Sequence, residues 1–273
     1  MTATFDFSGK QVFVFGGTSG INLGIAQSFA AAGADVAVAS RSQEKVDAAV
    51  EALGKHGGQS RGYALDVRDA EAVDAALKDH ADATGGLDIL ISGAAGNFPA
   101  LANGMSPNAF KSVVDIDLLG SFHVLRAAFP HLKKPGASVI NISAPQAFLA
   151  MPMQSHVCAA KAGVDMLTRT LALEWGPLGV RINSIAPGPI ADTEGMRRLA
   201  PTEDIEKACI ASVPMQRLGT VNEIGDAAMF LSSPAAAYVN GVVLPVDGGW
   251  SVAGASASAL AMSAPMLKQK PPA

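Results

Sequence analysis

Hydrophobic residues occur along the chain in two alternating patterns, short continuous runs and longer stretches of helical period. The short runs, rich in Val, Ile and Leu, predict strands at Gln11–Phe15, Asp35–Ser40, Arg61–Leu65, Asp88–Ser92, Ser138–Ile142, Arg181–Ala186 and Val242–Val246. The longer stretches predict helices at Ile21–Ala32, Gln43–His56, Ala70–Thr84, Pro107–Pro130, Val157–Trp175 and Asn222–Leu231. Because continuous hydrophobic strands suit a parallel sheet buried on both faces, we expect an α/β fold. Strand–helix alternation with right-handed crossovers predicts one Rossmann-type, doubly wound parallel sheet of about seven strands flanked by helices.

The predicted elements form one domain over residues 1–250, without an internal repeat or a linker between two halves. Residues 192–214 interrupt the alternation after the sixth strand, and we expect them to form a lid over a site. Residues 251–273 form a C-terminal tail that begins with a stretch rich in Ala and Ser. The composition of this stretch leaves two interpretations open, a short helix at a subunit contact or a loose end.

Composition narrows the class of partner. The 273 residues are 49% hydrophobic and 16% charged, which is ample material for a core. A formal net charge of −4 argues against nucleic acid or an anionic membrane as the main partner. Cys158 and Cys209 have no metal-ligand spacing, so no metal site is expected.

The ends of the sequence bear on cellular location. Met1–Lys10 lacks the basic and then apolar pattern of a signal peptide, and no apolar run makes a convincing membrane span. The final residues, Pro271-Pro272-Ala273, match no address tag. Two thiols without a secretory signal indicate a reduced, cytoplasmic protein, with a peroxisomal location as the alternative for a eukaryotic source.

A glycine-rich turn follows the first strand, with the sequence Gly16-Gly17-Thr18-Ser19-Gly20-Ile21. Glycine lets the backbone turn tightly and bring its N–H groups close to a pyrophosphate at the N-terminus of the next helix. Glycines also serve plain structural turns. The position between a strand and a helix favours nucleotide binding.

The second strand ends at Ser40-Arg41, where a site for NAD usually has an acidic residue. Ser40 and Arg41 would instead hydrogen-bond a 2′-phosphate, which predicts NADPH as the cofactor. The alternative for Arg41 is a solvated residue that opens the next helix. Asp66, after the third strand, either contacts the adenine edge or caps the helix that follows.

These residues, with Gly93-Ala94-Ala95-Gly96 and Pro187-Gly188-Pro189-Ile190, resemble the short-chain dehydrogenase/reductase family from about Gly9 to Trp250. Further stretches resemble the 2,4-dienoyl-CoA reductases of that family, the peroxisomal type most of all. They are Ala94-Ala95-Gly96-Asn97-Phe98, Asn108-Ala109-Phe110-Lys111 leading to Asp115-Ile116-Asp117, Glu174-Trp175-Gly176-Pro177 and Thr193-Glu194-Gly195. The resemblance implies an NADPH-dependent reductase of fatty acid degradation that forms a homotetramer.

The same resemblance implies roles for individual residues. The implied cofactor-binding residues are Gly16, Thr18, Ser19, Gly20, Ile21, Ser40, Arg41, Asp66, Val67, Lys161, Pro187, Gly188 and Ile190. The implied catalytic residues are Asp117 and Lys161, acting with a water, and Asn97, which would face the thioester carbonyl. The residues expected at the acyl-CoA substrate are Asn97, Phe98, Phe148, Met196 and Arg197. Phe148 and Met196 could equally be core filler, and Arg197 with Arg198 could be solvated lid residues rather than partners of CoA phosphates.

The chain also departs from the family pattern. The chain has two tyrosines, Tyr63 and Tyr238, and the position four residues before Lys161 is Val157 instead of the usual tyrosine. Ala144 stands where a serine is usual, and Phe15 where a threonine is usual. Asn22 replaces the third glycine of the turn; asparagine tolerates unusual backbone angles, so we expect the turn to survive with weaker cofactor binding.

Ketone reduction needs a proton on oxygen, which Val157 and Ala144 cannot deliver. In a 2,4-dienoyl thioester, hydride adds to C5, charge moves to the thioester oxygen, and the proton goes to carbon. We expect Asn97 to donate to that oxygen, and Asp117 with Lys161 to position the water that protonates C2, giving a 3-enoyl-CoA. Asp117 could instead cap a helix or pair with a surface lysine. The alternative functions are a carbonyl or ketoacyl reductase with an unconventional acid, and an NADPH-binding sensor without turnover.

Overall fold

The computed structural model describes residues 5–253, which fold around one parallel sheet. Its strands are β1 (Gln11–Phe15), β2 (Asp35–Ser40), β3 (Ser60–Ala64), β4 (Ile89–Ser92), β5 (Ser138–Ile142), β6 (Arg181–Pro187) and β7 (Val243–Val246). They are ordered β3-β2-β1-β4-β5-β6-β7, and each neighbouring pair is parallel. The predicted doubly wound sheet is confirmed, and the predicted strand ends differ from the observed ones by at most one residue.

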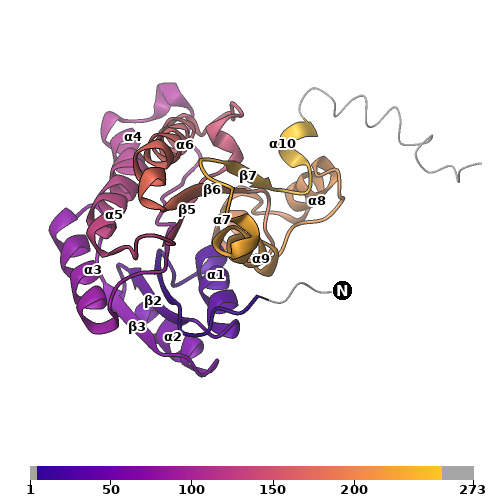
Figure 1. The fold of residues 1–273 in the computed structure, drawn as a ribbon. Coiled ribbons are helices and arrows are strands. Elements are labelled where there is room, and N and C mark those ends of the chain that lie inside the picture. The colour runs from indigo at the N-terminus through magenta and orange to yellow at the C-terminus, as the bar shows by residue number, and fades with distance from the viewer. Residues whose placement is uncertain (1–4, 254–273) are drawn as a thin grey trace, which may run out of the picture.

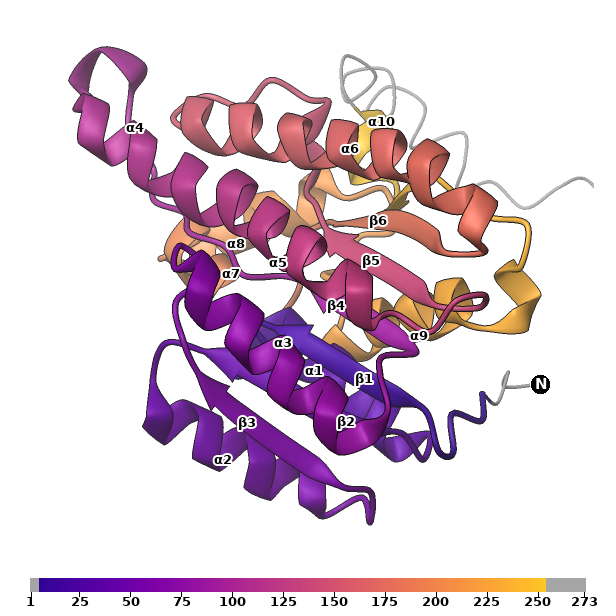
Figure 2. The same cartoon turned by 60° about the vertical axis from the view of Figure 1, so that its left-hand side comes forward.

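Helices cover both faces of the sheet (Figures 1 and 2). One face carries α1 (Gly20–Ala31), α2 (Gln43–Gly54) and α9 (Val221–Ser232), and the other carries α3 (Ala70–Thr84), α5 (Gly120–Ala128) and α6 (Ser155–Trp175). The remaining helices are α4 (Pro107–Val114), α7 (Glu194–Leu199), α8 (Glu203–Ser212) and α10 (Trp250–Ala253). Short 3₁₀ turns lie at Ala102–Gly104, Phe129–His131, Pro145–Ala147, Gly176–Leu178 and Pro234–Ala236.

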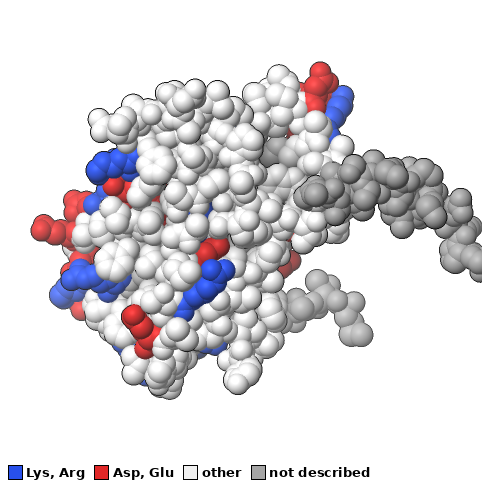
Figure 3. All heavy atoms as spheres, turned by 90° about the horizontal axis from the view of Figure 1, so that it is seen from above, with Lys and Arg blue, Asp and Glu red and all other residues white. Residues whose placement is uncertain are grey.

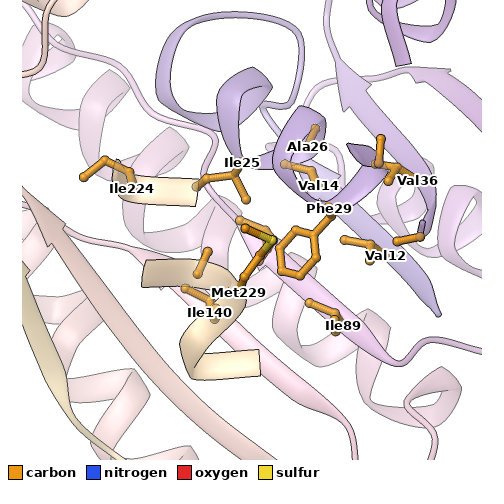
Figure 4. Close-up of a cluster of buried hydrophobic side chains, with 14 of the residues drawn as sticks. Val12, Val14, Ile25, Ala26, Phe29, Val36, Ile89, Ile140, Ile224 and Met229 are labelled. Carbon is orange, nitrogen blue, oxygen red and sulfur yellow. The ribbon is translucent and has the colours of Figure 1, made fainter. Parts of the chain in front are cut away.

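The two hydrophobic layers explain why a central strand such as β1 is hydrophobic at successive positions. Along β1, Val12 and Val14 pack into the layer under α1 and α9, where Phe29 and Met229 also lie (Figure 4). The alternate residues Phe13 and Phe15 pack into the layer under α3, α5 and α6. All four β1 residues are fully buried, and each contributes about 1.5–3 kcal/mol by leaving water.

The prediction of a helix over Pro107–Pro130 is confirmed in extent, but the helix is not α-helical throughout. The structure divides that stretch into α4, a π-helical segment (Asp115–Leu119) and α5, followed by a 3₁₀ turn. A π-helical turn holds one residue more than an α-helical turn. Asp117 is the buried residue of this segment, whereas Leu119 is 44% exposed. The hydrophobic period gave no sign of this change, because the segments are all helical and follow one another without a gap.

The region predicted as a lid contains α7 and α8, between β6 and α9. Thr193 and Thr202 begin these helices and accept hydrogen bonds from Met196 N and Ile205 N. The interruption of the strand–helix alternation is therefore made of two capped helices, and their action as a lid stays a prediction. Of the C-terminal tail, residues 254–273 lie outside the described residues, and with them most of the stretch for which a helix or a loose end was expected.

Within residues 5–253, no helix is both long and apolar enough to cross a membrane. The same residues contain no group of three or more His, Cys, Asp or Glu side chains that could hold a metal ion.

His80 is an unusual member of the core. Its ring lies 5.2 Å from the ring of Phe13, and neither ring nitrogen has a hydrogen-bond partner among the residues described. Burial lowers the pKa of His80 from 6.5 to about 4. Between these pH values the unfolded chain binds a proton that the folded chain excludes. The free energy of unfolding should therefore fall as the pH drops from 6.5 to about 4. Below pH 4 His80 should cause no further loss.

We expect His80 to lower the free energy of unfolding by about 2 kcal/mol when the pH falls from about 7 to about 5. Replacing it by leucine, His80→Leu, should remove that part of the pH dependence. Chemical denaturation of both proteins at the two pH values measures the difference. An identical pH dependence in both proteins would contradict the assignment.

Candidate active site

A cleft of about 500 Å³ opens beside the carboxyl ends of β1, β2, β3 and β4. The chain runs from β1 outward to β2 on one side, whereas β4 flanks β1 on the other. This is the point where the strand order reverses, and open α/β sheets bind ligands at such a point. The walls of the cleft are the segments that follow these four strands, and one end is closed by α7.

The glycine-rich turn forms the floor of the cleft and leads into α1. Gly16 has φ +76°, and a Cβ atom there would lie 3.0 Å from Ala94 Cα in the loop after β4. Ser19 is the N-cap of α1, but its side chain makes no capping hydrogen bond, and the first turn of α1 contains no acidic residue. The N–H groups of that turn therefore remain available to an anion such as a pyrophosphate.

The end of β2 supplies positive charge to the same cleft. Ser40 and Arg41 line it, together with Lys45 from α2. The N-cap of α2 is Ser42, which accepts from Lys45 N, so Arg41 precedes the helix and does not open it. Arg41 is exposed, as both interpretations of this residue require, and its contact with a 2′-phosphate stays a prediction.

Asp66 and Val67 line the cleft after β3. The N-cap of α3 is Asp69, so the alternative role of Asp66 as a helix cap is wrong. Arg68 donates hydrogen bonds to Asp66, and this contact holds the pKa of the Asp66 carboxyl below its ordinary value. Asp66 is thus an ionised acceptor at the wall of the cleft.

Asp117 and Lys161 form a buried ion pair beneath the loop after β4. Asp117 Oδ2 lies 3.4 Å from Lys161 Nζ, and the two residues are 0% and 5% exposed. Asp117 Oδ1 accepts a hydrogen bond of 2.7 Å from Gly96 N, and Lys161 Nζ donates to the carbonyl of Ile142 at 3.0 Å. Asp117 Oδ2 accepts no hydrogen bond from the described residues. The expectation that Asp117 pairs with a surface lysine or caps a helix is wrong.

Asn97 and Phe98 line the cleft directly after the glycine bound to Asp117. The ring of Phe98 packs on His156 of α6 at a centroid distance of 4.5 Å. The carbonyl of Asn97 accepts a hydrogen bond of 3.4 Å from Arg198 of α7. The side-chain Oδ1 of Asn97 is buried without a donor among the residues described. Asn97 and Phe98 are thus held between α7 and α6 at the edge of the cleft.

No tyrosine of the chain reaches this site. The hydroxyl of Tyr63 donates a hydrogen bond to Asp79. Tyr238 is fully exposed in the segment between α9 and β7. Val157 is 3% exposed, one turn before Lys161 on α6. The position of the usual phenol is therefore apolar and sealed.

Several predicted site residues lie outside the walls of the cleft. They are Gly20, Ile21, Lys161, Pro187, Gly188 and Ile190 from the cofactor set, Phe148, Met196 and Arg197 from the substrate set, and the catalytic candidate Asp117. Ile190 and Pro189 line a second cavity of about 330 Å³, while Met196 is the buried residue of α7. The roles of all these residues stay predictions.

The α7 side of the cleft is formed by Glu194, Gly195, Arg198 and Leu199, of which sequence reasoning named Arg198, together with Arg197, and missed the others. These residues share one face of α7 because they are spaced three to four residues apart. Arg198, which also forms an ion pair with Glu194, therefore faces the cleft in place of Arg197. The helical period of this segment was the signal that could have identified them.

A doubly wound parallel sheet, with a glycine-rich turn that leads into a helix whose first N–H groups are uncapped, defines a dinucleotide-binding fold. The model of the family described as enoyl-(acyl carrier protein) reductase matches residues 16–251. The chain belongs to the short-chain dehydrogenase/reductase family of oxidoreductases.

Relatives of known name give more detail. A protein of Saccharomyces cerevisiae named peroxisomal 2,4-dienoyl-CoA reductase, (3E)-enoyl-CoA-producing, is 44% identical over 89% of this chain and 84% of its own length. A Bacillus subtilis protein named probable 2,4-dienoyl-CoA reductase, (2E)-enoyl-CoA-producing, is 40% identical over 88% of this chain and 96% of its own. A solved structure of a proposed 2-deoxy-D-gluconate 3-dehydrogenase from Agrobacterium tumefaciens, with bound NADP, is 32% identical at a TM-score of 0.82, covering 91% of this chain and 99% of that one.

Proposed function

We propose that this protein reduces 2,4-dienoyl-CoA thioesters to 3-enoyl-CoA with NADPH. The observation that carries the proposal is the buried Asp117–Lys161 pair, which touches the loop of Asn97 where no phenol is available. The names of the relatives from yeast and Bacillus subtilis support the substrate class.

NADPH fits the residues of the cleft. The uncapped first turn of α1 suits the pyrophosphate, and Arg41 with Ser40 suits a 2′-phosphate. Lys45 adds a second positive charge at the same wall, which a carboxylate-based site for NAD would not require. The NADP in the related dehydrogenase structure supports this choice.

The bound reduced nicotinamide supplies the hydride that goes to C5 of the dienoyl chain. Asn97, at the edge of the cleft, donates a hydrogen bond to the thioester oxygen as negative charge develops there. Lys161 lies beside Asp117 in its buried position and compensates the charge of the carboxylate. Asp117 Oδ2, which has a free acceptor position, orients the water that gives a proton to C2 and regains one from solvent.

The proposed substrate contacts include Phe98 and residues that lie outside the cleft in this structure, Phe148, Met196 and Arg197. Phe148 is 48% exposed and Arg197 is solvated, so both can meet a long thioester without unfolding of the core. The cytoplasmic location also stays a prediction, beside yeast and animal relatives that are named peroxisomal.

We also propose a homotetramer. Most of the face seen in Figure 3 is formed by uncharged residues, and its charged side chains lie in separate groups. Exposed apolar side chains occur on α5 and α6, where Phe122 is 44% exposed, Met166 57% and Leu173 80%. Helices with such a surface suit burial against a second copy of the chain. Sedimentation equilibrium measures the mass of the assembly.

The purified protein should oxidise NADPH when hexadienoyl-CoA is added, and should do so much faster than with NADH or with ketone substrates. The product should be the 3-enoyl thioester, which chromatography separates from the 2-enoyl isomer. Reduction of ketones alone would favour a carbonyl reductase. Tight binding of NADPH without oxidation by any acyl-CoA would favour a sensor.

Arg41→Ala should weaken the binding of NADPH at least tenfold, because a charge-assisted hydrogen bond of about 1.5–3 kcal/mol is lost. The affinity for NADH should change little, because NADH lacks the 2′-phosphate. Fluorescence titration measures both dissociation constants. Arg61→Ala, an exposed arginine of β3 outside the cleft, serves as the control. Equal weakening of both cofactors by Arg41→Ala would remove the basis for NADPH selectivity.

Asp117→Ala should lower kcat for hexadienoyl-CoA by about 10²–10⁴-fold, the range for loss of general acid–base catalysis, while the dissociation constant of NADPH stays within a few-fold. Asp117→Ala leaves Lys161 buried without its counter-charge and also removes the acceptor for Gly96 N. Asp117→Asn is made alongside it, because asparagine loses the charge but keeps that acceptor. Asp115→Ala is the control, since Asp115 pairs with Lys111 at the surface of the same segment. Parallel losses of kcat and NADPH affinity would show that Asp117 is structural.

A further inference from the structure

Asn22 stands in the first turn of α1, where the nucleotide-binding turn ordinarily has its third glycine. Its backbone is helical; among the residues described, the non-glycine residues with positive φ are Met153, Asp192 and Gln216. The unusual backbone angle that asparagine was expected to accommodate is therefore absent. The side chain of Asn22 must be explained by its contacts.

The contact is made across the cleft floor to the loop after β4. Asn22 Nδ2 donates a hydrogen bond of 2.7 Å to the carbonyl of Gly93. A Cβ atom on Gly93 would lie 2.3 Å from Asn22 Oδ1, and one on Gly16 would lie 3.0 Å from Nδ2. The carboxamide thus occupies space that is free because residues 16 and 93 have no side chains. The third glycine is lost at position 22, and the loop opposite supplies the room.

This bond fixes one end of the loop from Gly93 to Asn97. At that end Gly93 also donates its N–H to the carbonyl of Phe15, at 3.1 Å. At the other end Gly96 donates its N–H to Asp117 Oδ1, at 2.7 Å. Between these fixed ends lie Ala94 and Ala95, and Asn97 follows directly. The position of Asn97 therefore depends on both anchors.

We propose that Asn22 is a positioning residue that ties the loop carrying Asn97 to the helix that receives the cofactor pyrophosphate. The turn of α1 and the donor to the substrate carbonyl then move as one body, so the acyl group is placed relative to the nicotinamide ring. This inference rests on the proposed function of Asn97, although the tie between Asn22 and Gly93 can be tested without any substrate.

Two variants separate the parts of the interaction. Asn22→Gly restores the residue usual for the fold and removes the side chain. Asn22→Asp keeps its size but replaces the Nδ2 donor with an oxygen that repels the Gly93 carbonyl. Asn222→Gly is the matched control, because Asn222 is an exposed asparagine in the first turn of α9.

Hydrogen–deuterium exchange of the peptide covering residues 93–98 is the primary measurement. Loss of one hydrogen bond that holds a loop should speed its exchange by about five- to tenfold in both Asn22 variants, with no change in α3 or in the Asn222→Gly protein. In steady-state assays of Asn22→Gly, kcat for hexadienoyl-CoA should fall about tenfold, while the KM for NADPH changes less than about threefold. Asn22→Asp is compared by exchange alone, because its carboxylate would also repel the pyrophosphate at the first turn of α1.

Unchanged exchange of residues 93–98 in both variants would overturn the proposal, whatever the activity. Faster exchange with an unaltered kcat would also overturn it, by reducing Asn22 to a stabilising contact. If the wild-type protein did not reduce any dienoyl-CoA, the proposed function would fail, and the exchange data would still decide whether Asn22 holds the loop.

Discussion

The site depends on two opposite charges that are held away from water. Transfer of a carboxylate and an ammonium group out of water is unfavourable by several kcal/mol for each, and their attraction compensates only if hydrogen bonds complete both groups. Asp117 Oδ1 accepts from Gly96 N and Lys161 donates to the carbonyl of Ile142, whereas Asp117 Oδ2 has only the charge of Lys161 beside it among the residues described. The pair therefore joins four segments that are distant in sequence, which are the loop after β4, the π-helical segment, the end of β5 and α6. None of these can shift without exposing a charge to an unsuitable environment.

In the proposed reaction, different residues stabilise the charge on oxygen and supply the proton, whereas a single phenol usually does both. In the proposed reaction the charge ends on the thioester oxygen and the proton on a carbon atom. Asn97 lies at the wall of the cleft, whereas Asp117 lies behind it, below the same loop. The apolar side chain of Val157 fills the ordinary place of the acid and excludes water from it. The geometry favours proton delivery from the side of the π-helical segment rather than from α6.

The strands could be predicted from the sequence almost to the residue, because the central strands β1, β4 and β5 are buried on both faces and are mostly hydrophobic. The glycine turn and the end of β2 were equally visible, since they follow strands directly. Asp117 and Lys161 were identified by family resemblance alone; hydrophobic periodicity treats both as ordinary helix residues. Which of Arg197 and Arg198 faces the cleft could not be predicted, because the sequence does not show which side of α7 turns toward the cleft.

Asn22 shows a different limit of sequence reasoning. Read alone, it is a defect in a glycine motif. Its partner, Gly93, lies 71 residues later, and the compensation depends on the missing side chain at that position. A local pattern cannot contain such information.

The π-helical segment Asp115–Leu119 has a consequence for how this chain can change length. A ring closed between residues i and i+5 holds one residue more than an α-helical ring, so side chains after the segment point in other directions than they would in an uninterrupted α-helix. Asp117 is the buried residue of this segment, so the direction of its carboxylate depends on the wide turn. A change of length by one residue here would alter that direction while α4 and α5 remained helices.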